Sequence, residues 1–213
     1  MLSTIQQQRD QRVVLHGVSW QTYKLLLTEL GDRRSSRLAY DEGVLEITMP
    51  SDRHETNTHL LERLVDVLTE ELDRPVKCFR STTLNRDDLQ KGAEPDSCYY
   101  IQSVSRIVGR TIDLDRDPPP DLVIEVDISS PSSRKFQIYQ SLGVPEIWRY
   151  RKNTVEIHQL QDGNYVMCQQ SPTFTFISTS ILNQFLQDAE TQDDTALIRT
   201  WRRWVRDRLQ ESC

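Results

Sequence analysis

The sequence has no long apolar run. Nowhere in its 213 residues do about 18 consecutive apolar residues occur, the length needed for a membrane-spanning helix. Residues 1–17 are polar and lack the apolar segment of a secretory signal. We therefore expect a cytoplasmic protein with no membrane partner. The length suffices for one domain with a sizeable core, and we predict a single domain over residues 1–213.

Cysteine is scarce, and the usual metal motifs are missing. The four cysteines are scattered, without a CxxC pair, so they indicate reduced thiols and neither a zinc site nor a disulfide framework. His54, Glu55 and His59 lie within two helical turns, but residue 58 is Thr58 and the HExxH spacing is absent. We interpret both histidines as structural rather than metal-binding.

A surplus of basic residues is also missing. The net charge of −6 argues against a protein whose whole surface binds nucleic acid. It does not exclude a nuclease, because acids that bind a metal lower the net charge. Two local basic segments occur, one containing Arg33, Arg34 and Arg37, the other spanning 199–208. Solvated surface is the ordinary interpretation of such segments, and a nucleic-acid contact is the alternative.

Helical and strand patterns alternate along the chain. Residues 1–18 show little periodicity and are expected to form a loose arm. Apolar spacing, capping residues and turn residues predict helices at 19–30, 52–73, 133–142 and 194–209, with another helix before the last. They predict hairpins at 37–49 and 154–170, and strands at 76–84, 97–102, 121–128 and 146–150, with a polar loop at 85–93.

The strand 121–128 carries acids on one face. Prolines precede it, and Ser129, Ser130 and Pro131 follow it. Its alternation places the aliphatic residues Leu122, Ile124, Val126 and Ile128 on one face, and Asp121, Val123, Glu125 and Asp127 on the other. The three acids would repel one another without a divalent cation or a lysine. Alternatively, Asp121 and Asp127 only cap the strand near solvent.

Three segments carry a resemblance to a known family: Glu94–Ile101, Pro120–Val126 and Lys135–Tyr150. On these segments the chain resembles the Uma-type restriction endonuclease family, abundant in cyanobacteria, of the PD-(D/E)XK nuclease superfamily. The resemblance runs from about residue 17 to 188. It leaves 189–213 as a C-terminal helical extension.

The resemblance implies a mixed α/β fold with a restriction-endonuclease-like core. Its elements follow the order α-β-β-β-α-β, with a central mixed sheet flanked by helices, an added N-terminal hairpin, and a C-terminal hairpin and helices. It also implies a hydrolase that cleaves DNA with Mg²⁺ or Mn²⁺. Asp96 and Glu125 would be the catalytic metal ligands and Lys135 the catalytic lysine, with Glu55 as an additional acid and Asp121 and Asp127 as supporting ones.

One position departs from the superfamily pattern. The lysine usually stands two residues after the second acid, and here that residue is Asp127. Lys135 from the following helix would have to reach back, with Arg134 or Lys77 as substitutes; otherwise Lys135 is a solvated helix residue.

Two functions therefore remain open. One is a metal-dependent endonuclease, and the other is an inactive nuclease-fold protein that serves as a binding or assembly module. A sugar hydrolase is less favoured, because no aromatic platform accompanies the acids. A homodimer stays open, since nothing in the sequence fixes the oligomeric state.

Overall fold

The computed structural model describes residues 9–31, 34–128 and 133–211. In chain order the elements are β1 (Gln11–His16), α1 (Trp20–Leu30), β2 (Arg37–Asp41), β3 (Val44–Met49), α2 (Asp52–Glu71), β4 (Lys77–Cys78), β5 (Leu84–Arg86), β6 (Lys91–Ala93), β7 (Ser97–Tyr100), the 3₁₀ turn η2 (Val104–Arg106), β8 (Leu122–Asp127), α3 (Ser133–Leu142), β9 (Glu146–Arg151), β10 (Thr154–Gln161), β11 (Asn164–Cys168), α4 (Thr179–Asp188) and α5 (Asp194–Glu211).

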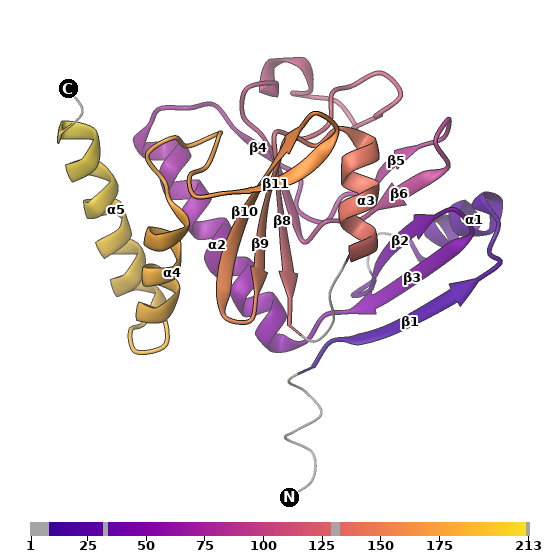
Figure 1. The fold of residues 1–213 in the computed structure, drawn as a ribbon, viewed down its shortest axis with the longest axis horizontal. Coiled ribbons are helices and arrows are strands. Elements are labelled where there is room, and N and C mark those ends of the chain that lie inside the picture. The colour runs from indigo at the N-terminus through magenta and orange to yellow at the C-terminus, as the bar shows by residue number, and fades with distance from the viewer. Residues whose placement is uncertain (1–8, 32–33, 129–132, 212–213) are drawn as a thin grey trace, which may run out of the picture.

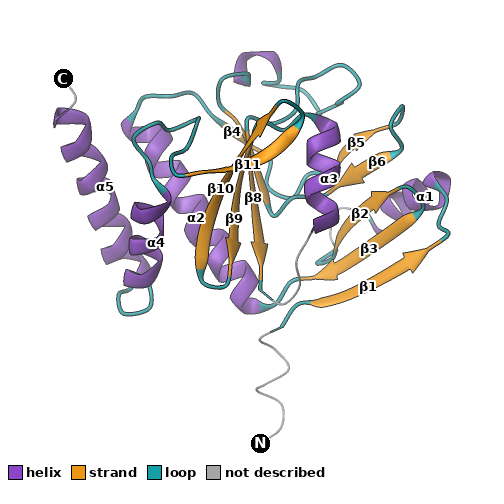
Figure 2. Cartoon of the chain, in the orientation of Figure 1, coloured by secondary structure: helices purple, strands orange, loops and turns teal. Residues whose placement is uncertain are grey.

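The strands form two sheets. Six of them make the central sheet, in the order β11-β10-β9-β8-β7-β4, and five make a second sheet in the order β1-β3-β2-β6-β5. Figure 1 shows the second sheet extending to one side of the central one, with α4 and α5 at the opposite side. Helix α3 lies where the two sheets meet and contacts β2 and β6, as the colouring of Figure 2 makes easy to follow.

The central sheet confirms the predicted fold class. Helix α2, strands β4, β7 and β8, helix α3 and strand β9 follow one another in the expected order. Strand β8 pairs antiparallel with β7 and parallel with β9, so the sheet is mixed. The parallel pair needs a crossover connection, and α3 supplies it.

Three local predictions were wrong. Within the expected N-terminal arm, Gln11–His16 form the edge strand β1, which pairs with β3 along its whole length. The strand expected at 76–84 ends after Cys78, because Arg80 takes a left-handed conformation at φ 46°. The polar loop expected at 85–93 instead contains most of the β5–β6 hairpin.

Strand β8 is buried on both sides. Leu122, Ile124 and Val126 face a large core formed with α2, α4 and α5, as predicted for the aliphatic face. Val123 faces a second core that includes Ile138 and Tyr139 of α3. The acidic face of the strand is therefore covered by α3.

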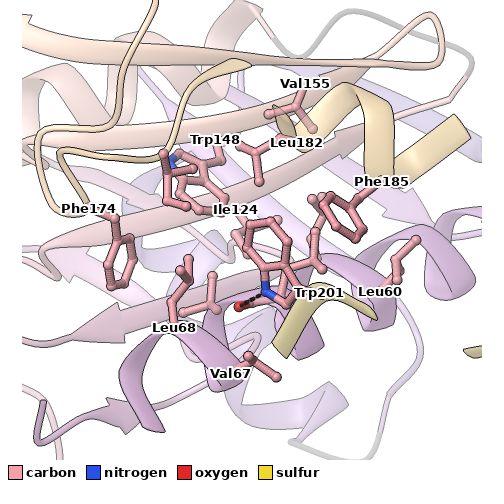
Figure 3. Packing of buried hydrophobic residues seen from close by; sticks show 14 of the residues in the cluster. Leu60, Val67, Leu68, Ile124, Trp148, Val155, Phe174, Leu182, Phe185 and Trp201 are labelled. Carbon is pink, nitrogen blue, oxygen red and sulfur yellow. Dashed lines mark hydrogen bonds between the residues drawn. The ribbon is translucent and has the colours of Figure 1, made fainter. Parts of the chain in front are cut away.

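The last helix belongs to the large core. Trp201 of α5 is fully buried and donates a hydrogen bond from Nε1 to the Leu64 carbonyl of α2, at 3.1 Å, a contact drawn in Figure 3. It also packs edge-on against Phe185 of α4. The segment expected to be an extension thus helps to cover the central sheet. Among the described residues, no helix is both long and apolar enough to cross a membrane.

Candidate active site

Asp96 and Glu125 come together through the pairing of two neighbouring strands. Ser97 of β7 lies opposite Ile124 of β8 in an antiparallel register. One step further along, the same register sets Asp96 beside Glu125. The Asp96 carboxylate also accepts a hydrogen bond from the Val126 backbone N–H at 2.8 Å. Both acids are buried, with exposed fractions of 3% and 1%, and both line one cavity.

The Glu125 carboxylate is held by two side chains of α3. Lys135 Nζ lies 2.9 Å and 3.2 Å from its two oxygens, and also donates to the Glu94 carbonyl at 3.0 Å. Tyr139, one helical turn later, donates its hydroxyl to Glu125 Oε1 at 2.5 Å. Residues four apart lie on the same helix face, which is why both reach one carboxylate.

Opposing influences act on the charge of Glu125. Burial raises its pKa, the Lys135 ammonium lowers it, the negative Asp96 raises it again, and the result is a pKa of about 7. For Lys135, burial lowers the pKa, but the carboxylates of Glu125 and Asp96 raise it above its ordinary value. The lysine therefore stays charged opposite the Glu125 carboxylate.

His54 holds Asp96 from the opposite side. It lies in the first turn of α2, where the Ser51 hydroxyl accepts a hydrogen bond from its backbone N–H. Its Nε2 is 2.9 Å from Asp96 Oδ1, and its Nδ1 is 3.3 Å from Asp10 Oδ2. Asp10 is fixed in turn by the backbone N–H and the hydroxyl of Ser51, both at 2.9 Å. The imidazole is thus clamped between two carboxylates.

This clamp sets the charge of each partner. Burial lowers the pKa of His54, but Asp96 and Asp10 raise it much more, to about 10. Burial raises the pKa of Asp96, yet His54 and Lys135 bring it down to about 2. His54 is therefore an imidazolium and Asp96 a carboxylate throughout the neutral range.

The cavity between these groups is small and charged. Its volume is about 30 Å³, enough for one or two water-sized particles. Besides the acids, Lys135 and His54, it is lined by Arg12, Arg37 and Glu46 of the second sheet. Arg12 forms an ion pair with Glu46. The second sheet therefore supplies cationic groups to a site whose acids come mainly from the central one.

The remaining predicted acids lie in different places. Asp127 lines the same cavity and is ion-paired with Arg149 at 2.6 Å. Asp121 lies at the other end of β8, where its carboxylate accepts hydrogen bonds from the Ile101 and Ser103 backbones at 2.6 Å and 3.2 Å. That is a structural turn contact. Glu55 is exposed beside the site, with its carboxylate 3.5 Å from Arg37.

Lys135 is not the solvated helix residue that the sequence left open, since only 5% of it is exposed. It does reach back to the acids from α3. The two substitutes do not line the cavity: Lys77 lies over the Phe79 ring, and Arg134 stands beside Lys135 on α3.

His54 and Asp10 were missed by the sequence interpretation. The missing HExxH spacing excluded His54 as a zinc ligand, but said nothing of a histidine that orients a carboxylate. Asp10 fell in the segment expected to be a loose arm. The only sequence signal for either was the capping residue Ser51, which fixes both.

The donor set suits a hard divalent cation. In the described part of the chain, no group of three or more His, Cys, Asp or Glu side chains converges as a metal-ligand cluster, so a cation here would have fewer protein ligands than that. Mg²⁺ is instead commonly bound through one or two carboxylates and keeps several waters. Two buried carboxylates beside a water-sized cavity match that requirement. To bind the cation, one oxygen of Glu125 would have to exchange its hydrogen bonds with Lys135 and Tyr139 for the metal.

Comparisons with known proteins agree with this fold. The Uma2 family model, described as "Putative restriction endonuclease", matches residues 20–192. A solved structure described as a "putative nuclease belonging to DUF820" from Anabaena variabilis ATCC 29413 is similar, with a TM-score of 0.52 and 17% sequence identity. The match covers 79% of this chain and 99% of that chain. A search of curated proteins found no match.

Proposed function

Because the chain belongs to the Uma2 family of restriction-endonuclease-like proteins, we propose that it is a metal-dependent nuclease that hydrolyses phosphodiester bonds of DNA. The observation that carries the proposal is the joint placement of Asp96 and Glu125 in one cavity, with the Lys135 ammonium 2.9 Å from Glu125. The active site is thus proposed to lie between β7, β8 and the first turn of α3.

In this proposal Asp96 and Glu125 hold the cation. Mg²⁺ or Mn²⁺ bound there supplies Lewis acidity, which polarises a phosphate and makes a bound water more acidic. Glu125 would act as a ligand in its ionised form, which the Lys135 ammonium stabilises although burial raises the pKa of this carboxyl. Tyr139 fixes the direction of the carboxylate that results.

Lys135 is proposed as the group that stabilises developing charge on the phosphate. Its ammonium is already desolvated and directed into the cavity, so little reorganisation is needed when negative charge appears. It replaces the lysine that the superfamily carries at the position of Asp127. His54 would act as a positioning residue that keeps Asp96 ionised and oriented.

The second candidate is an inactive nuclease-fold protein that binds or assembles. Asp127 in the usual lysine position favours it, as does the net charge of −6. The full use of Glu125 by Lys135 and Tyr139 also favours it. Both candidates keep the same fold, so cation binding and activity have to separate them.

The test is the nicking of a supercoiled plasmid by the full chain. We expect nicking with Mg²⁺ or Mn²⁺, none with EDTA, and none for Asp96→Asn, because this variant lacks a proposed ligand of the cation. A folded parent protein that nicks with neither metal would support the inactive module. An Asp96→Asn variant that nicks as fast as the parent would contradict the proposed site, because the activity would then not depend on Asp96.

A further inference from the structure

Two larger cavities lie next to the active site and share residues with it. One, of about 420 Å³, is lined by Arg34, Arg37 and a row of hydroxyl residues, Ser81, Thr82 and Thr83. The other, of about 340 Å³, is lined by Arg37, Ser81 and Asp96, among others. Arg37 lines both of these cavities. It also lines the small cavity beside Asp96 and Glu125, here called the catalytic cavity. The three cavities are therefore adjacent, and Arg37 lies where they meet.

The first of these cavities, here called the Arg37 cavity, is rich in hydrogen-bond donors. Glu94 is the one carboxylate among its described lining residues, and it forms an ion pair with Arg34. It also accepts hydrogen bonds from Thr83 Oγ1 at 2.8 Å and from the Leu38 backbone N–H at 2.7 Å. Once Glu94 and Arg34 neutralise each other, Arg37 is left as the surplus positive charge of the cavity.

Arg37 itself is weakly engaged. Its ion pair with Glu55 spans 3.5 Å, and the Glu55 side chain is 55% exposed, so the pair is easily displaced. Within the described residues, the buried Nε atoms of Arg37 and Arg34 have no acceptor. At Nε, both guanidinium groups therefore keep a hydrogen-bonding capacity that no acceptor in the described residues uses, and both residues line this cavity.

We infer that the Arg37 cavity binds the nucleotide of the substrate strand next to the cleaved bond, through its phosphate. Arginine and hydroxyl side chains are the usual partners of the nucleic-acid backbone. The volume suits a nucleotide rather than a bare phosphate ion, and Phe79 and Ile112 give the cavity an apolar wall. The inference rests on the proposed function and adds to it how the strand is held.

The test measures DNA affinity without cleavage. A fluorescein-labelled 20-base-pair duplex is titrated with the full chain in EDTA at several salt concentrations, and binding is followed by anisotropy. Losing one phosphate contact should weaken binding and lower the salt slope by about 1. We expect this for Arg37→Gln, with an affinity loss of about tenfold or more at low salt.

A second variant separates the Arg37 cavity from the catalytic one. Thr111 is exposed at the edge of the Arg37 cavity and does not line the catalytic cavity. Thr111→Asp places a negative charge where the phosphate would lie and should weaken binding. The matched control is Thr195→Asp, the same change at an exposed residue of α5, a helix at the opposite side of the central sheet from the second sheet (Figure 1). The control should bind like the parent.

Equal binding by the two Thr→Asp variants would overturn the inference. So would an unchanged salt slope in Arg37→Gln, or no DNA binding by the parent. Competition by a deoxynucleoside monophosphate as effective as that by unlabelled duplex would mean that a free nucleotide is the ligand, which also overturns it. If the expected losses occur but the parent never nicks DNA with metal, binding of a DNA phosphate in the Arg37 cavity is supported, while the nuclease proposal, and with it the position next to a cleaved bond, is overturned.

Discussion

At the scale of single residues, Lys135 and Glu125 depend on each other. Both are buried, and each is the nearest opposite charge to the other, at 2.9 Å. Removing one member of such a pair leaves the other charge buried without compensation.

Lys135→Ala should therefore lower the free energy of unfolding by about 3–5 kcal/mol. Thermal and urea unfolding of the metal-free protein measure this. The control is Lys24→Ala, which removes an exposed ion pair with Asp87 and should cost no more than about 1 kcal/mol. Replacing both partners, as in Glu125→Leu with Lys135→Met, should be milder than Lys135→Ala alone. If Lys135→Ala is as stable as the control, the lysine is not buried against Glu125.

His54 gives the metal-free protein a pH dependence. Its folded-state pKa of about 10 lies above the ordinary value of 6.5, so the folded state binds its proton more tightly. The stability contributed by this group is fully present below pH 6.5 and is lost as the pH rises towards 10. We expect the melting temperature in EDTA to fall between pH 6.5 and pH 9.5.

The matched variant for this pH effect is His54→Gln. It should be less stable than the parent at pH 6.5, and its melting temperature should fall less over the same interval. A variant whose melting temperature falls as steeply as that of the parent would show that other groups cause the change.

At this scale the sequence named some of the residues that line the cavity. Asp96, Glu125 and Lys135 could be named because their motif segments are intact. The clamp of His54 and Asp10 could not, because it depends on β1 and α2 meeting across 44 residues of chain. The role of Asp121 as a turn acceptor could not be predicted either, since strand alternation groups it with Glu125.

At the scale of elements, periodic segments were predictable and short ones were not. Helix α2 and strand β8 have strong apolar patterns and lie close to their expected bounds. Every residue of strand β1 is exposed, so no alternation of buried apolar and exposed polar residues predicted it. Strands β5 and β6 have three residues each, and their pairing depends on contacts with distant parts of the chain.

The β5–β6 hairpin depends on the absence of a side chain at Gly92. A Cβ atom at Gly92 would meet Asn85 Oδ1 at 1.9 Å and the Tyr23 hydroxyl at 2.6 Å. Tyr23 donates to Asn85 at 2.8 Å, so this contact joins α1 to the sheet. Gly92→Ala should destabilise the protein by about 1–3 kcal/mol in urea unfolding.

The control is the same change made in an Asn85→Ala background. There the closest clash is removed, and Gly92→Ala should cost clearly less. An equal cost in both backgrounds would mean that the contact with Asn85 is not what excludes a side chain at position 92.

At the scale of the whole molecule, two sheets and α3 close around one small charged cavity. The central sheet supplies Asp96 and Glu125, α3 supplies Lys135, and the second sheet supplies Arg12 and Arg37. A cation bound only by this folded arrangement stabilises it by mass action. The central claim is that Asp96 and Glu125 together hold that cation.

Calorimetric titration of Mn²⁺ into the metal-free protein tests this claim most directly. We expect one site in the parent, its loss in both Asp96→Asn and Glu125→Gln, and its retention in Glu29→Gln, an exposed position on α1. Binding that survives either of the first two substitutions, or a folded parent that binds no Mn²⁺, would contradict it.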